Sequence, residues 1–487
     1  MPYPFKFCPK AIAIAVWAAS VLMPVLATGA TVESWVTTVD QTQTLAPQPP
    51  ITMGDSAPAG VPAIHIDPSI TYQTMLGLGA SLEHTTCANL WRLSPEKRAE
   101  VMARLVSPEH GIGMNTMRIC IGTPDFTGDP WYSYNDRPAG EKDPKLEHFS
   151  IEKDRDYILP VLKLALEKNP DLRFFASPWS PPGWMKTGDD LIGGHLYPRY
   201  YKAYAQYFVK FIRAYEAEGI PIHAVTVQNE PGVNKRDDVK SWWYPSCQWS
   251  LVEDEDTWWP VNREVMGLPE RDFIRDHLGP AFEAAGIATK IWCFDHNFNN
   301  LWYPRNILSD PEAAKYVEGT AFHPYVGEPA SMGAFKQEFP EKSVYLTEGS
   351  TFGLKGASKI IAYLRNWAST YNAWVVMTDT QGEPNNGPFE ATQTCITLDA
   401  DTLEVRYNFD YYMYGHFMKF IQRGAVRIDS GEALPDLDHV AFRNPDGSTV
   451  LVVVNHRTTP AQIDVATGDS PFNATLPPGS LATFRIT

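Results

Sequence analysis

The sequence predicts an α/β fold, a (β/α)8 TIM barrel with an all-β sandwich side domain formed by both chain ends. Eight short apolar segments alternate with helical stretches over residues 75–405, as in a (β/α)8 barrel. Strand patterns without helix signals follow from about residue 426. A doubly wound open sheet has the same local texture as a barrel, and the count of eight strands favours the barrel.

The eight strand candidates of the barrel are short, apolar and about 40 residues apart on average. They are residues 75–80, 116–121, 174–177, 224–228, 290–295, 320–323, 344–347 and 374–378.

Helix boundary signals separate several of these strands. Ser94 is a typical N-cap and precedes a proline in the first turn. Two further helices are predicted over residues 199–218 and 271–285, and each is followed by a glycine, Gly219 and Gly286, as is common after a helix.

The two chain ends are expected to form the second domain. Strands are predicted at 440–443, 450–454, 463–465 and 481–486, with the turn sequence Asn-Pro-Asp-Gly at 444–447. Residues 31–74 would supply further strands to this sandwich, and residues 406–487 its C-terminal part. Residues 75–405 would be the barrel.

Residues 1–30 resemble a secretory signal peptide. Lys6 and Lys10 precede an almost wholly apolar run from Ala11 to Leu26, and small residues follow. An uncleaved anchor is the alternative, but the run is short for a bilayer span. We therefore expect a secreted or periplasmic protein without an integral membrane segment after signal removal.

The charge balance restricts the partners. The net charge of −16 disfavours nucleic acid and anionic lipid as main ligands and suits a neutral carbohydrate or glycoside. Beyond Cys8, five scattered cysteines are not a disulfide framework, although one or two bridges are open. Without a CxxC or HExxH pattern, we expect no metal and no cofactor.

Two glutamates stand where a barrel carries its chemistry. Glu230 follows the fourth predicted strand and Glu348 the seventh, so both would lie at the C-terminal mouth of the barrel, facing each other. A single glutamate there could be an ion-pair partner, but an opposed pair is what glycoside hydrolysis needs. The separation that distinguishes retention from inversion is not readable from sequence.

These residues belong to motifs that resemble glycoside hydrolase family 30, the glucosylceramidase-like retaining β-glycosidases. The resemblance runs from about Gln73 to the C-terminus. Its specific pieces are Met-Arg-Ile at 117–119, Ala-Ser-Pro-Trp at 176–179, Pro-Gly-Trp-Met-Lys-Thr at 182–187, Ala-Val-Thr-Val-Gln-Asn-Glu-Pro at 224–231 and Asp-Pro-Glu-Ala-Ala-Lys-Tyr-Val at 310–317. The resemblance implies that Glu230 is the general acid/base and Glu348 the nucleophile of a retaining enzyme.

The resemblance also implies roles for neighbouring residues. Arg118 would keep Glu348 ionised, with a structural ion pair as the alternative. Asp125 and Trp179 would bind sugar hydroxyls, although Trp179 could instead belong to the core. Asn229 would contact the 2-hydroxyl of the sugar.

His323 and Tyr325, in the His-Pro-Tyr sequence after the sixth strand, are expected in the pocket, although a lone histidine is often structural. The pair Asp295 and His296 suggests a metal at first sight, but no third ligand has suitable sequence spacing.

One departure from the family concerns the loop that follows Thr378-Asp379. In the predicted order of strands, this dipeptide stands at the end of the eighth strand. Thr380 stands where relatives of glucosylceramidase carry an aromatic ring. We expect this loop to wall the pocket and to alter its preference. The aromatic pieces at 242–244 and 258–259 could add a sugar platform.

The expected function is a secreted retaining β-glycoside hydrolase of the β-glucosidase or glucosylceramidase type, with a link to sphingolipid metabolism. Alternatives are an endo-acting β-1,6-glucanase or xylanase, or an exo-acting β-fucosidase or galactosidase. A non-catalytic carbohydrate-binding protein is the alternative from another class, but it would be expected to lack one of the two carboxylates.

Overall fold

The computed structural model describes residues 1, 31–54, 60–233, 243–249, 264–391, 393–468 and 470–487. Residues 2–30, with most of the expected signal peptide, lie outside the described part, as do Trp242, Trp258 and Trp259. Among the described helices, none combines the length and the apolar character that crossing a bilayer requires.

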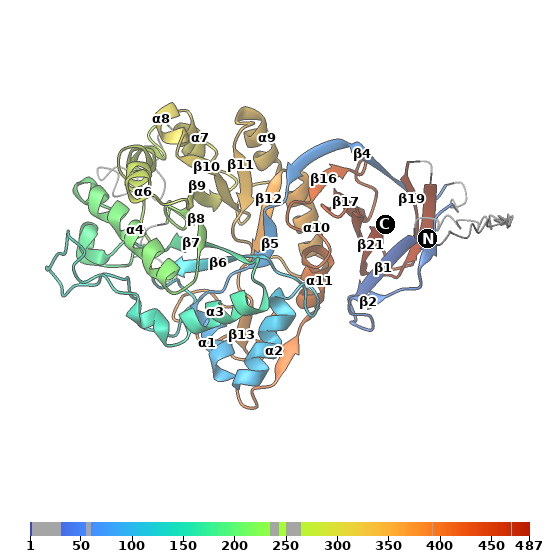
Figure 1. Cartoon of the computed structure of the whole chain (residues 1–487), viewed down its shortest axis with the longest axis horizontal. Coiled ribbons are helices and arrows are strands. Elements are labelled where there is room, and N and C mark those ends of the chain that lie inside the picture. The colour runs from blue at the N-terminus through green and yellow to red at the C-terminus, as the bar shows by residue number, and fades with distance from the viewer. Residues whose placement is uncertain (2–30, 55–59, 234–242, 250–263, 392, 469) are drawn as a thin grey trace.

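The described chain forms two parts that lie side by side, a barrel and a β-sandwich (Figure 1). The barrel strands are β5 (Gly77–Ala80), β6 (Thr116–Ile121), β7 (Arg173–Pro178), β8 (Ile222–Thr226), β9 (Lys290–Asn297), β10 (Val317–His323), β11 (Ser343–Leu346) and β12 (Ala368–Ala373). The α-helices are α1 (His84–Arg92), α2 (Pro95–Val106), α3 (Ile158–Lys168), α4 (Tyr201–Ala217), α5 (Leu268–Phe273), α6 (Gly279–Ala285), α7 (Trp302–Leu308), α8 (Pro311–Ala314), α9 (Ala330–Glu338), α10 (Gly353–Arg365) and α11 (Phe409–Met418).

The eight parallel strands close into the predicted barrel. Each strand pairs with its sequence neighbour from β6 to β12, and β12 pairs with β5. The last gap, between β5 and β6, is bridged where the Leu82 N–H donates to the Arg118 carbonyl at 2.8 Å. The (β/α)8 prediction is therefore confirmed, and the open-sheet alternative is wrong.

The helix signals act as expected. The Ser94 side chain accepts from the Lys97 N–H and caps α2. Gly219 and Gly286 both adopt left-handed backbone after α4 and α6, where a residue with a Cβ would be strained. The helix expected at 271–285 is three consecutive pieces, because a π-helical segment (Ile274–Leu278) separates α5 from α6.

The eighth strand is the main error of the sequence prediction. Residues 374–378 were expected there, but β12 ends at Ala373, and β13 (Met377–Asp379) belongs to a separate small sheet with β14 (Ile396–Leu398) and β15 (Val405–Tyr407). Both segments are short and buried, so composition cannot choose between them. Only the register with β11 and β5 assigns residues 368–373 to the barrel.

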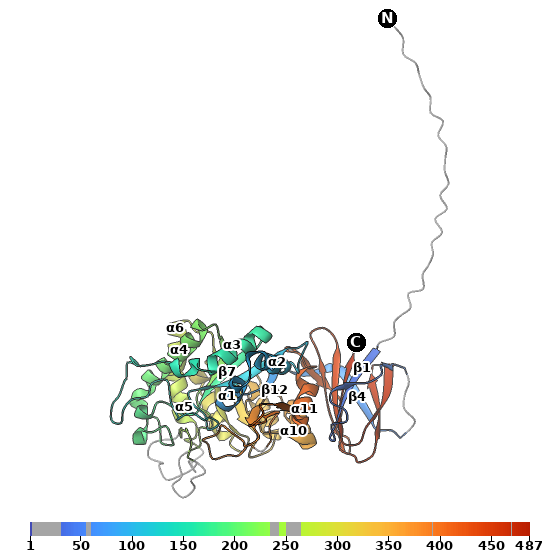
Figure 2. The same cartoon turned by 90° about the horizontal axis from the view of Figure 1, so that it is seen from below.

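The sandwich unites the two chain ends as predicted (Figures 1 and 2). Its strands are β1 (Thr31–Thr38), β2 (Ala46–Pro47), β3 (Ile51–Thr52), β4 (Ala63–Thr74), β16 (Val426–Asp429), β17 (Leu437–Arg443), β18 (Thr449–Asn455), β19 (Ala461–Thr467), β20 (Ser470–Leu476) and β21 (Ser480–Ile486). The sequence missed β16 and β20. The predicted turn at 444–447 joins β17 to β18, and the Asn444 N–H donates to the Ser448 carbonyl.

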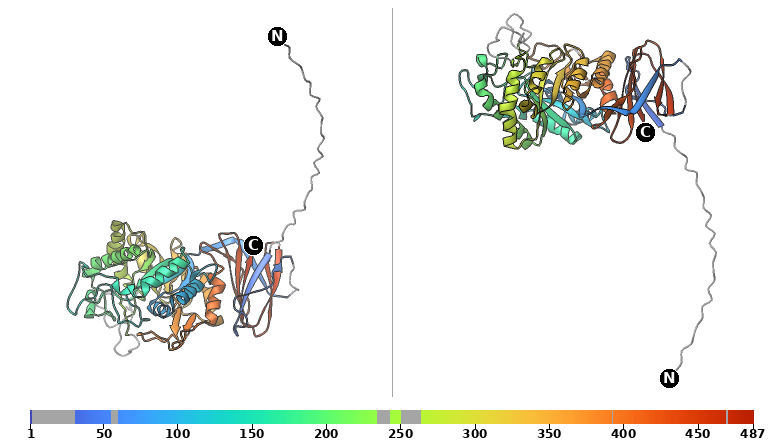
Figure 3. Two further views of the ribbon diagram at one scale, coloured as in Figure 1. Left: turned by 60° about the horizontal axis from the view of Figure 1, so that its bottom comes forward. Right: turned by 90° about the horizontal axis from the view of Figure 1, so that it is seen from above.

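Strand β4 pairs with two other strands of the sandwich and continues toward the barrel, as Figure 3 shows. It pairs parallel with β19 at Ala63–Ile66 and antiparallel with β16 further on. Helices α10 and α11 lie between the two parts (Figure 1). From α11, buried His416 contacts Thr37 of β1 at 2.9 Å and Thr483 of β21 at 2.8 Å.

The barrel interior is divided into an apolar layer and a polar layer. Phe175, Trp292 and Tyr345 fill the first, with the Trp292 and Tyr345 rings stacked at 4.0 Å between centroids. Nearer the strand ends the side chains become polar, with Ser177 in β7, Thr347 after β11 and, beyond a register shift, Asp295 in β9. This second layer is the floor of a cavity at the C-terminal ends of the strands, where barrels carry their active sites.

Candidate active site

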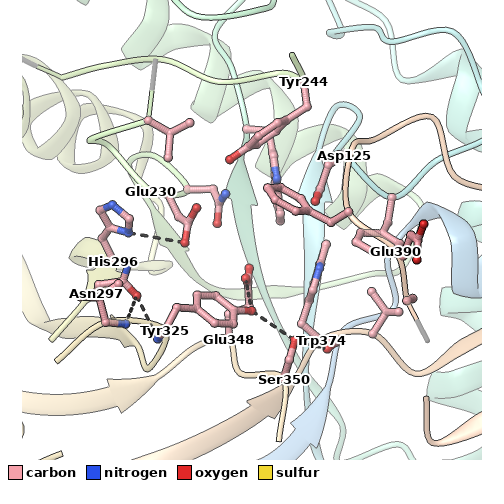
Figure 4. A pocket seen from close by; sticks show the side chains of 18 of the residues that line it. Asp125, Glu230, Tyr244, His296, Asn297, Tyr325, Glu348, Ser350, Trp374 and Glu390 are labelled. Carbon is pink, nitrogen blue, oxygen red and sulfur yellow. Dashed lines mark hydrogen bonds and ion pairs between the residues drawn. The ribbon is translucent and has the colours of Figure 1, made fainter. Parts of the chain in front are cut away.

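The cavity at the barrel mouth has a volume of about 510 Å³ and brings most of the predicted site residues together (Figure 4). Its lining residues are Asp125, Phe126, Trp179, Asn229, Glu230, Val233, Tyr244, His296, Asn297, Tyr325, Val326, Glu348, Ser350, Phe352, Trp374, Val375, Phe389, Glu390, Ala391 and Gln393. Of the residues predicted for the site, Arg118 and His323 lie just beneath it, and both are fully buried.

Glu230 and Glu348 face each other across this cavity. His323 Nδ1 lies 3.0 Å from Glu230 Oε1 and 3.8 Å from Glu348 Oε1. Because both distances start from one nitrogen, these two carboxyl oxygens lie no more than about 7 Å apart, close enough to act on the two sides of one glycosidic bond. The predicted pairing of the two carboxylates is therefore present in the structure.

Local backbone geometry aims Glu230 into the cavity. It stands four residues beyond the end of β8 and has a positive φ of 49°, which is uncommon for a residue with a side chain. The Glu230 N–H donates to the Asp295 carbonyl at 3.1 Å, and the Glu230 carbonyl accepts from Val233 at 2.9 Å. These bonds hold the turn that lifts the carboxylate above the strand end.

Arg118 is the centre of the polar layer. Its guanidinium donates to Glu348, to Asn229 Oδ1 at 2.8 Å and to Asp295 Oδ2 at 2.7 Å. Asp295 additionally accepts from Ser177, Thr226 and Thr347. Burial alone would raise the pKa of Asp295, but the charge of Arg118 and that of His323 outweigh it and hold this carboxyl ionised. Arg118 is thus a partner of the proposed nucleophile, as the sequence suggested.

A bulge in β9 brings two consecutive side chains to the site. Asp295 has a positive φ of 61°, and the pairing of β9 with β10 shifts by one residue at this point. Successive residues of a regular strand point to opposite faces, whereas a bulge can redirect one of them. Asp295 therefore reaches Arg118 in the barrel while His296 lines the cavity above it (Figure 4).

His323 links the two sides of the site. Its Nε2 lies 3.1 Å from Asp295 Oδ1, and its Nδ1 faces Glu230. Burial alone would lower the pKa of His323, but Glu348, Asp295 and Glu230 raise it to about 10. The sequence left open whether this histidine is structural, and its contacts with both carboxylates make it part of the site.

Two histidines control the charge of Glu230. A general acid needs a raised pKa, which a nearby negative charge such as that of Glu348 can supply. Burial also favours a raised pKa, but the charges and hydrogen bonds of His296 and His323 outweigh it and lower the pKa of Glu230. Since the pKa of Glu230 is lowered and that of His323 is raised, a proton between the two groups favours the imidazole.

Tyr325 and Asp125 contact the cavity from opposite sides. The Tyr325 hydroxyl donates to Glu348 Oε1 at 2.7 Å. Although the residue is 45% exposed, burial of this hydroxyl and the charge of Glu348 raise its pKa, so it stays a donor. Burial, followed by the charge of Glu348, raises the pKa of Asp125 to about 8. Asp125 Oδ1 is buried and has no hydrogen-bond partner among the described residues, so it is available to a ligand.

Two tryptophans form one wall of the cavity. Trp179 and Trp374 stack with ring centroids 5.2 Å apart, and the Arg118 guanidinium lies 4.8 Å from the Trp179 centroid. Trp179 is only 2% exposed, so it serves both the core and the cavity wall. Such paired rings suit the apolar face of a sugar.

The structure corrects the expectation about Thr378–Asp379. These residues are in β13, outside the cavity lining. Asp379 forms an ion pair with Arg92, with 2.8 Å between Oδ2 and Nη1. The aromatic ring that follows the true eighth strand is Trp374, directly after β12. The pocket wall comes instead from Phe389, Glu390, Ala391 and Gln393, beyond the loop that the sequence singled out.

Sequence reasoning missed several lining residues. Trp374 was hidden by the wrong strand assignment, and His296 was considered only for its spacing from Asp295. Tyr244 belonged to an aromatic segment noted at 242–244, and its ring lies 5.6 Å from that of Phe389 across the rim. The five described cysteines, Cys87, Cys120, Cys247, Cys293 and Cys395, are buried and free, so the bridges left open do not form among them.

Comparisons with known proteins agree with this geometry. The endo-1,6-beta-D-glucanase of Neurospora crassa is 32% identical over 410 residues, covering 80% of each chain. The lysosomal acid glucosylceramidase of Mus musculus is 29% identical over 446 residues, covering 85% of this chain and 81% of the relative. A solved endo-beta1,6-glucanase superposes with a TM-score of 0.81 at 30% identity, covering 93% of this chain and 99% of its own.

Family models match both parts of the molecule. The glycosyl hydrolase family 30 TIM-barrel domain matches residues 75–249 and 265–421, and the family's beta sandwich domain matches residues 424–484. With the barrel, the sandwich and the facing carboxylates in place, the chain belongs to glycosyl hydrolase family 30 and is a glycoside hydrolase.

Proposed function

We propose that the protein is a retaining β-glycoside hydrolase that cleaves β-1,6-linked glucan. The observation that carries the retaining reaction is the shared contact of Glu230 and Glu348 with His323 Nδ1, which keeps the two carboxyl oxygens close together. The substrate class is supported by similarity to proteins named endo-1,6-beta-glucanases, both in sequence and in solved structure. The comparisons support this reading better than the β-glucosidase or glucosylceramidase type that the sequence favoured.

In the proposed mechanism, Glu348 attacks the anomeric carbon and forms a glycosyl-enzyme. Arg118 and Tyr325 hold its two oxygens before the attack. Glu230 donates a proton to the leaving oxygen, and its proton comes from His323 along the 3.0 Å contact when substrate excludes water from the cavity. After the leaving group departs, Glu230 accepts a proton from the attacking water, and the sugar is released with retained configuration.

The remaining lining residues would bind the sugar. Asn229 accepts from Arg118 through Oδ1, which leaves its amide nitrogen to donate to the 2-hydroxyl. Asp125, protonated, would hold hydroxyls at the far side of the ring, and Trp179 with Trp374 would stack on its apolar face.

A second substrate is favoured by one specific observation. Val326 and Phe389 are 48% and 41% exposed at the cavity rim, and such apolar surface could accept the aglycone of a glycolipid. The similarity to mouse lysosomal acid glucosylceramidase points the same way. We also propose, from residues 1–30, that the protein is secreted or periplasmic.

The experiment compares purified enzyme on a β-1,6-glucan, a β-1,3-glucan, xylan and glucosylceramide. Proton NMR of the first reducing sugar released gives the anomer. Activity highest on the β-1,6-glucan, with β-anomer first, supports the proposal. An α-anomer as first product would overturn retention, and activity confined to glucosylceramide would overturn the glucan assignment while leaving the mechanism intact.

A further inference from the structure

We propose that Glu230, His296 and His323 form a site for a late divalent transition metal, Zn²⁺ or Cu²⁺, whose binding excludes catalysis. One ligand atom from each of the three side chains lies within 4.8 Å of the other two. They come from three separate segments, the turn after β8, strand β9 and the end of β10, so their sequence spacing carries no metal motif.

The donor separations suit a metal of this size. Glu230 Oε1 lies 3.0 Å from His323 Nδ1 and 3.5 Å from His296 Nδ1. Tetrahedral Zn²⁺ with ligands at about 2.0–2.1 Å puts its donor atoms about 3.3 Å apart. Two of the three donor separations are therefore close to those of a tetrahedral site, and the third, between the two histidine nitrogens, is no more than 4.8 Å.

An outer carboxylate orients His323 as a ligand. Its Nε2 is 3.1 Å from Asp295 Oδ1, so when a metal ion displaces the Nδ1 proton, the remaining ring proton stays on Nε2 and the Nδ1 lone pair faces Glu230. Metal-bound histidines commonly donate their other ring N–H to a carboxylate in this way. Asp295 is itself held by Arg118 at 2.7 Å, so the orientation is rigid.

The nearby carboxylates and the position of the ligands at the cavity also favour Zn²⁺ or Cu²⁺. Asp295 and Glu348 add two carboxylates near the three ligands, and Arg118 pairs with both of them. Glu230 and His296 line the cavity, which leaves a further coordination position for water or a substrate oxygen. Two imidazoles and one carboxylate suit Zn²⁺ and Cu²⁺ better than Mg²⁺ or Ca²⁺.

Metal and catalysis require the same atom. Glu230 must carry the proton for the leaving group, and a metal ion on Oε1 prevents this while occupying the space of the scissile oxygen. The metal would therefore act as a reversible inhibitor that competes with substrate, and EDTA would restore the activity.

The test is binding of Zn²⁺ to EDTA-treated, dialysed enzyme by isothermal titration calorimetry, with Cu²⁺ electron paramagnetic resonance to report nitrogen ligands. We expect one site in the wild type, affinity at least about tenfold lower in His296→Asn, and loss of the site in Glu230→Gln. The matched control is His456→Asn, because His456 also contacts a carboxylate, Asp438 at 3.0 Å, yet belongs to no three-ligand group among the described residues.

Unchanged Zn²⁺ affinity in both His296→Asn and Glu230→Gln would overturn the proposal, as would absence of binding in the wild type. Circular dichroism of each variant verifies that the fold is kept. These readouts need no turnover, so they are independent of the substrate proposed above. On active enzyme, Zn²⁺ should raise the apparent KM, and inhibition that lowers only kcat would contradict the shared site.

Discussion

Asp295 Oδ2 accepts a hydrogen bond of 2.7 Å from the Arg118 guanidinium, and neither side chain has any exposed surface. The contact joins β9 to β6 across the barrel directly beneath Glu348. Removing one member of a fully buried ion pair leaves the other charge without compensation, which costs about 3–5 kcal/mol.

Asp295→Asn should therefore lower both the free energy of unfolding and kcat. Urea denaturation should show a loss of about 3 kcal/mol, and kcat should fall because Arg118 and His323 are no longer held. The control is Asp438→Asn, a half-exposed pair with His456, which should cost about 1 kcal/mol or less. If both variants lost the same free energy of unfolding, the buried pair would contribute no more to stability than the exposed one.

Variants of the two glutamates should differ in how their activity depends on the leaving group of the substrate. Glu348→Gln should abolish turnover on every substrate, because no glycosyl-enzyme forms. Glu230→Ala should spare aryl glycosides with very good leaving groups and lose activity on the glucan by about 10²-fold or more, since only poor leaving groups need the proton. Stopped assays on a leaving-group series measure this, and equal losses across the series would contradict the acid role of Glu230.

Asp125 should make substrate binding sensitive to alkaline pH. Its raised pKa of about 8 keeps it protonated at neutral pH, so it donates to a sugar hydroxyl. As pH rises through about 8, the carboxyl ionises beside Glu348, the donor is lost and KM should rise. In Asp125→Asn, which stays a donor, KM should not rise over this interval. A parallel rise in wild type and variant would place the titration on another group.

Trp374 should contribute to affinity as the ring that follows the true eighth strand. Trp374→Ala removes one stacked face, worth about 0.5–1.5 kcal/mol, so KM should rise about two- to tenfold. Trp302→Ala removes a ring that is 41% exposed and does not line the cavity, and it should leave KM unchanged. An identical effect of the two variants would argue against a sugar platform at Trp374.

Glu83 should make the free energy of unfolding fall as pH rises, because its pKa is higher in the folded protein than in the unfolded chain. Its Oε1 caps α1 through the Thr86 N–H, whereas burial raises its pKa to about 7. The protonated form is stable in the fold, so this contribution is full below about pH 4.5 and is lost, by about 3 kcal/mol, as pH rises through 7. In Glu83→Gln, thermal unfolding across this interval should lose that part of the pH dependence. An unchanged profile would show that Glu83 is ionised in the fold.

Several features of this molecule are determined by short stretches of sequence. Ser94 caps the start of α2 with its side chain, and Gly219 and Gly286 end α4 and α6 through left-handed backbone, so each signal depends on a few neighbouring residues. Glu230 and Glu348 are recognisable because each follows an apolar strand, and parallel strands of a barrel deliver such residues to one rim.

Other features depend on contacts between distant segments. The strand at 368–373 was not distinguishable from 374–378, because both are short and buried and only the pairing with β11 and β5 selects the first. The pocket residues at 389–393 lie in a connection whose path has no periodic signal.

The sequence by itself therefore determined the reaction class, through two carboxylates at the ends of strands that must face each other. Only the tertiary structure decided which charged groups surround those carboxylates. A bulge at Asp295, a histidine from β10 and an arginine from β6 meet there, and electrostatic interactions depend on distance and burial in space rather than on separation along the chain.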